Sequence, residues 1–243
     1  MNILETSQIS KAFGGIQALD NCSIKVEEGE IMGLIGPNGS GKTTLFNVIT
    51  GYIPPDTGNV QFNGRSITHS RPDQVFNQGL GRTFQLTRIF SRLTVLENMH
   101  VAAQRHEMQA LLRRWSSHHE QQKALELLDF VGITQHKNTL AGSLSYGQKK
   151  LLEFAFILIS EPKVILLDEP AGGINPTLLN HLADRIRVLN ERGVTFLLVE
   201  HNMEFVMGLC DRITVLHRGA KIAEGLPEEV RKNPLVLEAY LGG

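Results

Sequence analysis

Short apolar runs of strand length recur along the chain, and helical patterns lie between several of them. The runs are Ile31–Ile35, Val164–Leu167, Val194–Val199 and Ile213–Leu216. One helical pattern, Pro176–Glu191, places Leu179, Leu182, Ile186 and Leu189 on a single face. Strands and helices that alternate in this way predict an α/β fold with a largely parallel sheet.

Two other regions have different patterns. Short runs of alternating apolar and polar residues occupy the first thirty residues and Gly58–Asn63, which is typical of antiparallel strands. Strand signals stop from about Leu86 to Leu140, where Thr94–Leu112 and Glu120–Val131 have the spacing of amphipathic helices. The sequence therefore predicts an antiparallel β subdomain and a helical subdomain beside the parallel sheet.

These patterns divide one domain, residues 1–243, into parts. We expect residues 1–85 and 160–243 to form the sheet core together with the antiparallel β subdomain, and residues 86–159 to form an inserted helical subdomain. The end of the chain, residues 226–243, is charged and predicts a short helical tail. A chain of this length can bury a substantial core.

The octapeptide GPNGSGKT, residues Gly36–Thr43, follows the first predicted parallel strand. Its glycines allow consecutive N–H groups to face a phosphate, Lys42 can reach the β- and γ-phosphates, and the Thr43 hydroxyl can bind Mg²⁺. Residues Thr44–Thr50 predict a helix whose positive end faces the anion. A tight strand-to-helix turn is the alternative. The pattern predicts a nucleoside triphosphate site with the contacts Gly36, Pro37, Asn38, Gly39, Ser40, Gly41, Lys42, Thr43 and Thr44.

Charged residues and a histidine follow two other predicted parallel strands. Asp168 and Glu169 come directly after Val164–Leu167, and His201 follows Val194–Val199. Because parallel strands end at one edge of the sheet, these side chains should lie beside the phosphate loop. Asp168 would hold Mg²⁺, Glu169 would activate water as a general base, and His201 would bond the γ-phosphate. Solvated acids at a strand end and a structural histidine are the alternatives.

The segment LSYGQ precedes an apolar helical run, Lys149–Ile159. Ser145 and Gly147 therefore lie at a helix N-terminus, where free N–H groups and the helix dipole attract anions. A serine that only caps the helix is the alternative, and the residues alone favour it. Two phosphate-binding elements cannot easily hold the same triphosphate within one subunit.

Composition restricts the classes of partner. The chain has 24 basic and 25 acidic residues and a formal net charge of -1, whereas nucleic-acid-binding proteins usually have a basic excess. Cys22 and Cys210 lack the spacing of a metal site, so we expect reduced thiols in a cytosolic protein. The N-terminal segment does not resemble a secretory signal, and the best apolar run, Phe154–Ile159, is shorter than the roughly 20 residues that span a bilayer. We expect no nucleic-acid partner and no membrane crossing by this chain.

Taken together and in this order, GPNGSGKT, LSYGQ, VILLDEP and the histidine of VEH resemble the nucleotide-binding subunits of ATP-binding cassette (ABC) transporters. The resemblance covers essentially the whole chain and implies a P-loop NTPase core, related to RecA, that uses ATP and Mg²⁺. In that family two cassettes pack head to tail, and each ATP lies between the phosphate loop of one and the signature loop of the other. The resemblance therefore implies a second ATPase subunit, whose bound ATP would contact Ser145, Gly147 and Gln148.

The resemblance also assigns roles to two residues that otherwise read as a core aromatic and a polar loop residue. Phe13 matches the aromatic side chain that stacks on adenine, and Gln85 in GRTFQ matches the glutamine that senses Mg²⁺ and links to the helical subdomain. The implied catalytic residues are Lys42, Gln85, Glu169 and His201. The implied metal ligands are Thr43, Gln85 and Asp168.

Two positions depart from the family pattern. Tyr146 stands where the signature usually has glycine, so a phenol lies close to a loop that should approach phosphate. Asn175 stands where an aspartate is common, which keeps hydrogen bonding and removes a charge. The effect of both residues on coupling between subunits stays open.

Within the family, several stretches look like the ATPase subunits of branched-chain amino acid importers. These stretches are FGGIQALDN, GRTFQLTRIFSRLTVLENM, DEPAGGINP and NPLVLEAYLGG. Cassettes for urea, short amides or exported lipopolysaccharide share some of them, so the cargo and the direction of transport stay open. A soluble cassette ATPase that acts on DNA or ribosomes is the alternative outside transport, although this short, near-neutral, single cassette does not suit it.

The resemblance implies a subunit that powers membrane transport with ATP. It would sit peripherally at the cytoplasmic face of the inner (plasma) membrane, held there by transmembrane permease subunits, and pair with an identical or paralogous ATPase. Apolar residues within Gln85–Thr94, namely Leu86, Ile89, Phe90 and Leu93, predict the docking surface for the permease. Packing between subdomains is the alternative for these residues.

Overall fold

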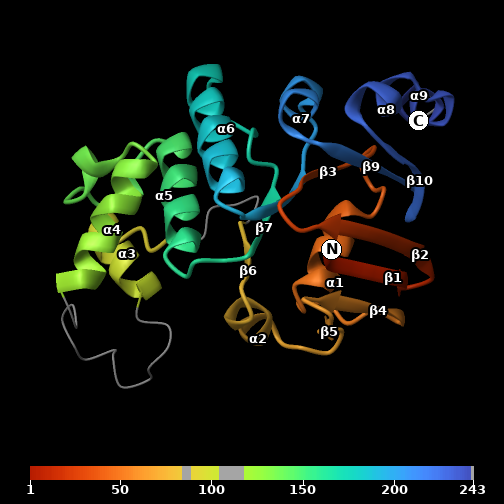
Figure 1. Ribbon diagram of the computed structural model, residues 1–243, viewed down its shortest axis with the longest axis horizontal. Coiled ribbons are helices and arrows are strands. Elements are labelled where there is room, and N and C mark those ends of the chain that lie inside the picture. The colour runs from red at the N-terminus through yellow and green to blue at the C-terminus, as the bar shows by residue number, and fades with distance from the viewer. Residues whose placement is uncertain (84–88, 104–117, 242–243) are drawn as a thin grey trace. The chain divides into compact units, whose positions relative to one another are not determined.

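The computed structural model describes residues 1–83, 89–103 and 118–241 (Figure 1). The chain forms two compact units. Unit 1 consists of Met1–Arg82, Lys163–Ala171 and Leu189–Gly243, and unit 2 consists of Thr83–Pro162 and Gly172–Val188.

Unit 1 contains a six-stranded sheet with the order β10-β9-β3-β8-β7-β6. Its strands are β3 (Ile31–Ile35), β6 (Leu80–Arg82), β7 (Val164–Asp168), β8 (Thr195–Val199), β9 (Arg212–His217) and β10 (Ala220–Gly225). All neighbours pair in parallel except β9 and β10. Every residue of β3, β7 and β8 is buried, which explains their continuous apolar sequences. The predicted largely parallel sheet is confirmed.

A second sheet in unit 1 is antiparallel and has the order β2-β1-β4-β5. Its strands are β1 (Asn2–Phe13), β2 (Ile16–Glu27), β4 (Thr57–Phe62) and β5 (Arg65–Ser66). One buried cluster joins Leu4, Ile24 and Phe62 of this sheet with Met32 of β3 and Phe46 of helix α1, which spans Lys42–Ile49. The predicted antiparallel β subdomain therefore shares its core with the parallel sheet.

Four further helices belong to unit 1. They are α2 (Pro72–Asn77), α7 (Met203–Leu209), α8 (Pro227–Lys232) and α9 (Pro234–Leu241). The tail after residue 226, predicted to be helical, consists of α8 and α9. Prolines stand at the first position of both helices, where a missing N–H costs no intrahelical bond.

Unit 2 is helical. It contains α3 (Val95–Ala103), α4 (His118–Phe130), α5 (Tyr146–Leu158), most of α6 (Pro176–Glu191) and the short 3₁₀ helices η3 (Thr134–His136) and η4 (Ala141–Ser143). The end of the predicted helix Thr94–Leu112 lies outside the described residues.

Helix α6 belongs mostly to the helical unit, whereas the sequence-based division placed all of 160–243 with the core. The contacts of α6 explain the difference. His181 Nε2 lies 3.1 Å from the carbonyl oxygen of Val131, and the Arg185 guanidinium lies 5.2 Å from the ring centre of Phe130. Both partners follow or end α4, so tertiary packing assigns the first part of α6 to unit 2.

No helix within the described ranges is long and apolar enough to span a bilayer. Cys22 and Cys210 are buried free thiols. Burial raises the pKa of Cys22 to about 11 and raises the pKa of Cys210 further. Neither residue therefore presents a reactive thiolate near neutral pH.

Candidate active site

The phosphate loop, Gly36–Thr43, connects β3 to α1, as the sequence predicts. Gly36 and Gly41 have φ angles of 150° and 102°. A Cβ atom on Gly36 would lie 2.1 Å from the carbonyl oxygen of Leu216, and one on Gly41 would lie 2.5 Å from that of Ala18. Close packing against β9 and β2 therefore requires glycine at both ends of the loop.

Lys42 reaches back over this loop from the first position of α1. Its Nζ donates to the carbonyl oxygens of Gly36 and Pro37, each at 2.8 Å, and to Ser40 Oγ at 3.3 Å. Burial lowers the pKa of Lys42, while the nearby carboxylates of Glu169 and Asp168 oppose that change. In the structure, the predicted lysine thus lies close enough to both predicted carboxylates for their charges to interact.

The loop presents several polar groups to solvent. Asn38, Gly39 and Thr43 are exposed, whereas Pro37 and Thr44 are half-buried. The N–H groups of the first helical turn have no acceptor within the helix, and Gly41, which caps α1, has no side chain to accept from them. Such a turn is a favourable site for an anion.

Asp168, the last residue of β7, forms a buried ion pair with Arg82 at the end of β6. Arg82 Nη2 lies 2.8 Å from Asp168 Oδ2, and both side chains are 6% exposed. Arg82 Nη1 also donates to Asn47 Oδ1 at 2.7 Å and to Thr50 Oγ1 at 3.0 Å. Arg82 therefore connects the carboxylate to α1, the helix that follows the phosphate loop.

Sequence reasoning missed Arg82. One arginine in a chain with many charged residues has no pattern of its own, and its position beside Gln85 was the only available signal. The structure identifies it as a positioning residue for Asp168, because it contacts that carboxylate and two side chains of the α1 segment.

Replacing Arg82 by methionine is expected to lower the free energy of unfolding by about 3–5 kcal/mol, because Asp168 would keep a buried charge without this partner. Denaturant unfolding measures the change. Arg71→Met is the matched control, since the Arg71–Asp73 pair is 73% and 61% exposed and such a pair contributes less than about 1 kcal/mol. An equal, small change in both variants would contradict the positioning role of Arg82.

Glu169 and His201 meet at the C-terminal ends of β7 and β8. His201 Nε2 lies 3.0 Å from Glu169 Oε1. Glu169 has a φ of 50°, and its N–H donates to the carbonyl oxygen of Val199 at 2.9 Å. This hydrogen bond holds the backbone of Glu169 against the end of β8. It therefore fixes the point from which the Glu169 side chain extends.

Glu200 is a second residue that sequence reasoning missed. Its side chain is buried, and it accepts hydrogen bonds from the backbone N–H groups of Ala171, His201 and Asn202. One carboxylate thereby joins the segment after β7 to the segment after β8. The available signal was an acidic residue between a predicted strand and His201. A solvent-exposed glutamate at the end of a strand has the same sequence pattern, so the signal did not identify Glu200.

The predicted metal ligands fall partly within the described residues. Thr43 and Asp168 belong to unit 1 and offer hydroxyl and carboxylate oxygens, which suit Mg²⁺. Gln85 lies outside the described residues, and its roles stay predictions. No group of three or more His, Cys, Asp or Glu side chains in the described part of the chain could hold a metal.

Phe13 ends β1 and is 45% exposed, with Lys11 Nζ 5.6 Å from its ring centre. An exposed ring fits the expected stacking on adenine better than the alternative of a core aromatic. The stacking itself stays a prediction.

Ser145 caps helix α5 in unit 2. Its Oγ accepts from the Gln148 N–H at 3.3 Å, and Gln148 Oε1 accepts from the Ser145 N–H at 2.9 Å. Gln148 Nε2 also lies 2.9 Å from Nε2 of His136. The serine is exposed, so it can serve both as a cap and as an anion contact.

Gly147 is buried at the same helix start. A Cβ atom there would lie 2.3 Å from Leu178 Cδ2 of α6, so a larger residue at this position would require the Leu178 side chain to move. Tyr146 is 40% exposed, and its ring occupies the space beside Gly173. Asn175 Oδ1 accepts from the Leu178 N–H at 2.9 Å and so caps α6.

The predicted permease-docking residues are described only in part. Phe90 is 48% exposed, and Ile89 and Leu93 are half-buried. Leu86 lies outside the described residues. Docking at this surface stays a prediction.

The chain matches two family models. The model described as ABC transporter matches residues 19–172. The model described as branched-chain amino acid ATP-binding cassette transporter matches residues 220–243. The first match alone covers more than half of the chain and contains the phosphate loop, the segment LSYGQ and the carboxylates Asp168 and Glu169.

Curated relatives align along almost their entire length. The high-affinity branched-chain amino acid transport ATP-binding protein BraF of Pseudomonas aeruginosa is 39% identical over 249 residues, which cover 99% of this chain and 98% of BraF. The protein LivG of Escherichia coli, with the same description, is 38% identical over 250 residues, covering 99% and 98% of the two chains.

Solved structures agree with these matches. The ADP conformation of MJ1267, an ATP-binding cassette of an ABC transporter, has a TM-score of 0.89 and 36% identity, with both chains covered completely. The dimeric structure of MJ0796, a bacterial ABC transporter cassette, has a TM-score of 0.82 and 26% identity, covering 92% of this chain and 98% of MJ0796. The chain therefore belongs to the ABC transporter family, in which it is an ATP-binding cassette with ATPase activity.

Proposed function

We propose that this chain is the ATPase subunit of an importer for branched-chain or related amino acids. The observation that carries the proposal is the arrangement in unit 1, where Lys42, Asp168, Glu169 and His201 gather around the phosphate loop. The names of the relatives support the cargo, because BraF and LivG are described as branched-chain amino acid transport proteins. Cassettes for urea, short amides or lipopolysaccharide are the alternatives within the family.

The phosphate loop binds the triphosphate of ATP. Backbone N–H groups of the loop and of the first turn of α1 face the phosphate oxygens, and Lys42 supplies a positive charge that the loop itself holds in place. Phe13 stacks on the adenine from the end of β1. Asp168, Thr43 and Gln85 would hold Mg²⁺, which neutralises charge on the phosphates when it is bound.

Hydrolysis requires a base that activates water and a second group that holds the γ-phosphate in position for in-line attack by that water. Glu169 takes the proton of the attacking water, and its bond to His201 sets the orientation of the carboxylate. His201 lies at the same edge of the sheet, where its imidazole can bond the γ-phosphate. The positive φ of Glu169 and its backbone bond to Val199 hold this base at the end of β7.

A second cassette completes the site. Ser145, Gly147 and Gln148 stand at the start of α5 in unit 2, where exposed Ser145 and the helix N-terminus can contact the γ-phosphate of ATP bound to a sister subunit. The dimeric MJ0796 cassette supports such pairing. ATP binding then closes the cassette pair, and hydrolysis followed by product release reopens it.

The turnover per chain is expected to rise with protein concentration, because two subunits are needed to assemble each site. Steady-state ATP hydrolysis measured over a dilution series checks this. Ser145→Arg is the companion variant, which should bind ATP normally at its own phosphate loop and lose turnover. Full turnover per chain at the highest dilution, or normal turnover in Ser145→Arg, would show that one subunit is sufficient.

Permease subunits at the cytoplasmic face of the membrane are the proposed partners. Co-purification of the intact chain from membranes, compared with ribosomes and DNA, distinguishes a transport ATPase from a soluble cassette. Recovery with two transmembrane proteins is expected. Recovery with ribosomes or DNA alone would instead support the soluble alternative, and identification of the permeases would also limit the cargo.

A further inference from the structure

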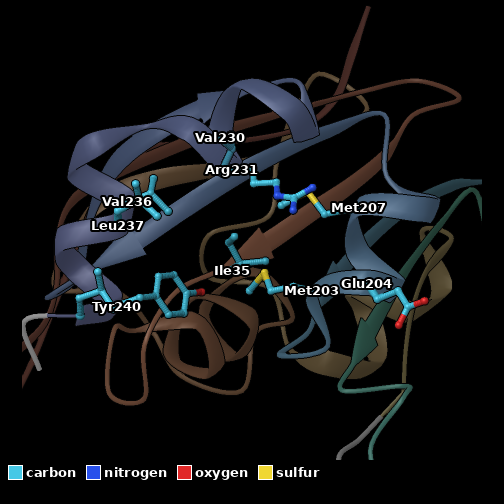
Figure 2. Close-up of a pocket in the computed structure, with 10 residues that line it drawn as sticks. Ile35, Met203, Glu204, Met207, Val230, Arg231, Val236, Leu237 and Tyr240 are labelled. Carbon is cyan, nitrogen blue, oxygen red and sulfur yellow. The ribbon is translucent and has the colours of Figure 1, made fainter.

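A cavity of about 580 Å³ lies within unit 1, beside the start of the phosphate loop. Helices α7, α8 and α9 and the end of β3 form its walls (Figure 2). Cavities of this size are typical of sites for small molecules. None of the catalytic residues assigned above lines it.

The lining is mainly apolar. Met203 and Met207 of α7 lie across from Val236 and Leu237 of α9, with Ile35 between them (Figure 2). Methionine side chains are unbranched and adapt to the shape of a bound group. Such a wall fits an aliphatic group better than a polar one.

Two charged residues also line the cavity, and they differ in direction. The Arg231 guanidinium, from the last turn of α8, points toward Met207 in Figure 2, whereas the Glu204 carboxylate points away from the other labelled residues. A guanidinium binds a carboxylate through two parallel hydrogen bonds. The lining therefore combines apolar side chains with one positively charged group, Arg231, that favours an anion.

The cavity wall is connected to the nucleotide site. Ile35 is buried, lines the cavity and immediately precedes Gly36. Tyr240 of α9 also lines the cavity, and its phenol oxygen lies near the Gly36 N–H. Burial raises the pKa of that phenol, and the Gly36 N–H partly opposes the change. A group that orders α9 would therefore also order the first residue of the phosphate loop.

We propose that this cavity binds a small aliphatic carboxylate and that its occupancy strengthens ATP binding at the phosphate loop. The ligand would place its hydrocarbon group against the methionines and its carboxylate on Arg231. Ordering of α9 would also restrict Gly36, because Tyr240 of α9 lies near that residue. ATP binding would then lose less conformational entropy in the phosphate loop and would become tighter. The second part of this inference rests on the proposed ATP site, whereas the first does not.

Binding is tested on the full chain without nucleotide, with 4-methylpentanoate as the probe and isothermal titration calorimetry as the measurement. Saturable binding with a dissociation constant of roughly 1 mM or tighter is expected for so small a ligand. Arg231→Gln, a change at an exposed side chain, should weaken binding about tenfold or more, and 3-methylbutylamine, which lacks the carboxylate, should not bind. The absence of saturable binding, or equal binding by Arg231→Gln, would overturn the site.

Leucine distinguishes an amino acid ligand from a simple carboxylic acid. It has the same carbon skeleton as 4-methylpentanoate and an additional ammonium group. Tighter binding of leucine would identify an amino acid as the ligand, and weaker binding would identify a simple carboxylic acid. Val236→Trp, which fills the cavity, should abolish binding of both. Denaturant unfolding must show that this variant is folded, and Arg231→Gln gives the independent test if it is not.

Coupling is tested by measuring the dissociation constant of ATP with and without saturating 4-methylpentanoate. The ligand should tighten ATP binding about fivefold, at the lower end of typical coupling between two sites. Tyr240→Phe should still bind the ligand and lose the effect on ATP, because the phenol oxygen near the Gly36 N–H is removed. Ligand binding without any change in ATP affinity would overturn the coupling, and failure of ATP binding in every sample would instead count against the proposed function.

Discussion

Glu169→Gln is expected to lower ATP turnover by roughly 10² to 10⁴, the effect of removing a general base, while ATP still binds. The amide keeps the shape of the side chain and can still contact His201 Nε2, which lies 3.0 Å from the carboxylate. It cannot accept the proton of the attacking water. The variant should therefore accumulate as an ATP-bound cassette dimer, which gel filtration with ATP would detect and single-turnover kinetics would quantify.

Glu161→Gln offers a matched control for this change. Glu161 also has a positive φ, 49° compared with 50° for Glu169, and it also bonds a basic side chain, Lys123, at 2.6 Å. It belongs to unit 2, whereas Lys42, Asp168, Glu169 and His201 belong to unit 1. Its substitution should leave turnover close to that of the wild type. Near-normal hydrolysis by Glu169→Gln would remove that residue from its role as base.

Lys42→Ala is expected to weaken ATP binding itself, by roughly 10- to 100-fold. This range corresponds to the loss of a charge-assisted hydrogen bond, about 1.5–3 kcal/mol. The lysine is buried and already oriented by the carbonyl oxygens of Gly36 and Pro37, so little ordering is needed when phosphate arrives. Isothermal titration calorimetry with ATP measures the change.

Lys25→Ala is the control for the loss of a positive charge, because that side chain is 59% exposed and pairs with Glu5 at 3.5 Å. It should bind ATP as the wild type does. Denaturant unfolding of Lys42→Ala separates a loss of affinity from a loss of structure. An unchanged dissociation constant in a folded Lys42→Ala variant would contradict the assignment of the phosphate loop.

The buried parallel strands could be predicted closely from the sequence. The apolar run Ile31–Ile35 coincides with β3, and Pro176–Glu191 coincides with α6. Both have a strong local pattern: complete burial in the strand and a clear apolar face in the helix. The short edge strands β5 and β6 were not predicted, because two or three residues are too few to establish a period.

The grouping of α6 could not be derived from its own pattern. Periodicity shows that a helix has an apolar face, and it does not show which neighbour covers that face. The contacts of His181 and Arg185 with the α4 region supply this information only in three dimensions. The same limit applies to α7, whose seven residues are too few for a clear helical period.

The candidate site was predictable where a motif has a direct chemical reason. Lys42, Asp168, Glu169 and His201 follow strands of one sheet, and the structure brings them together. Arg82 and Glu200 were missed because their roles depend on partners distant in sequence, such as Asp168 and Ala171. Supporting residues of this type have no fixed spacing from the residues that they hold.

The Glu200 carboxylate limits how much the lengths of the two loops after β7 and β8 can change. Its bonds to Ala171 and to the N–H groups after β8 hold two loops as a single piece. Lengthening either loop by even one amino acid would shift these N–H groups off the shared acceptor and separate Glu169 from His201. Insertions that preserve activity should therefore lie outside the two loops that Glu200 joins. A library of single-codon insertions would show directly which positions tolerate an added residue.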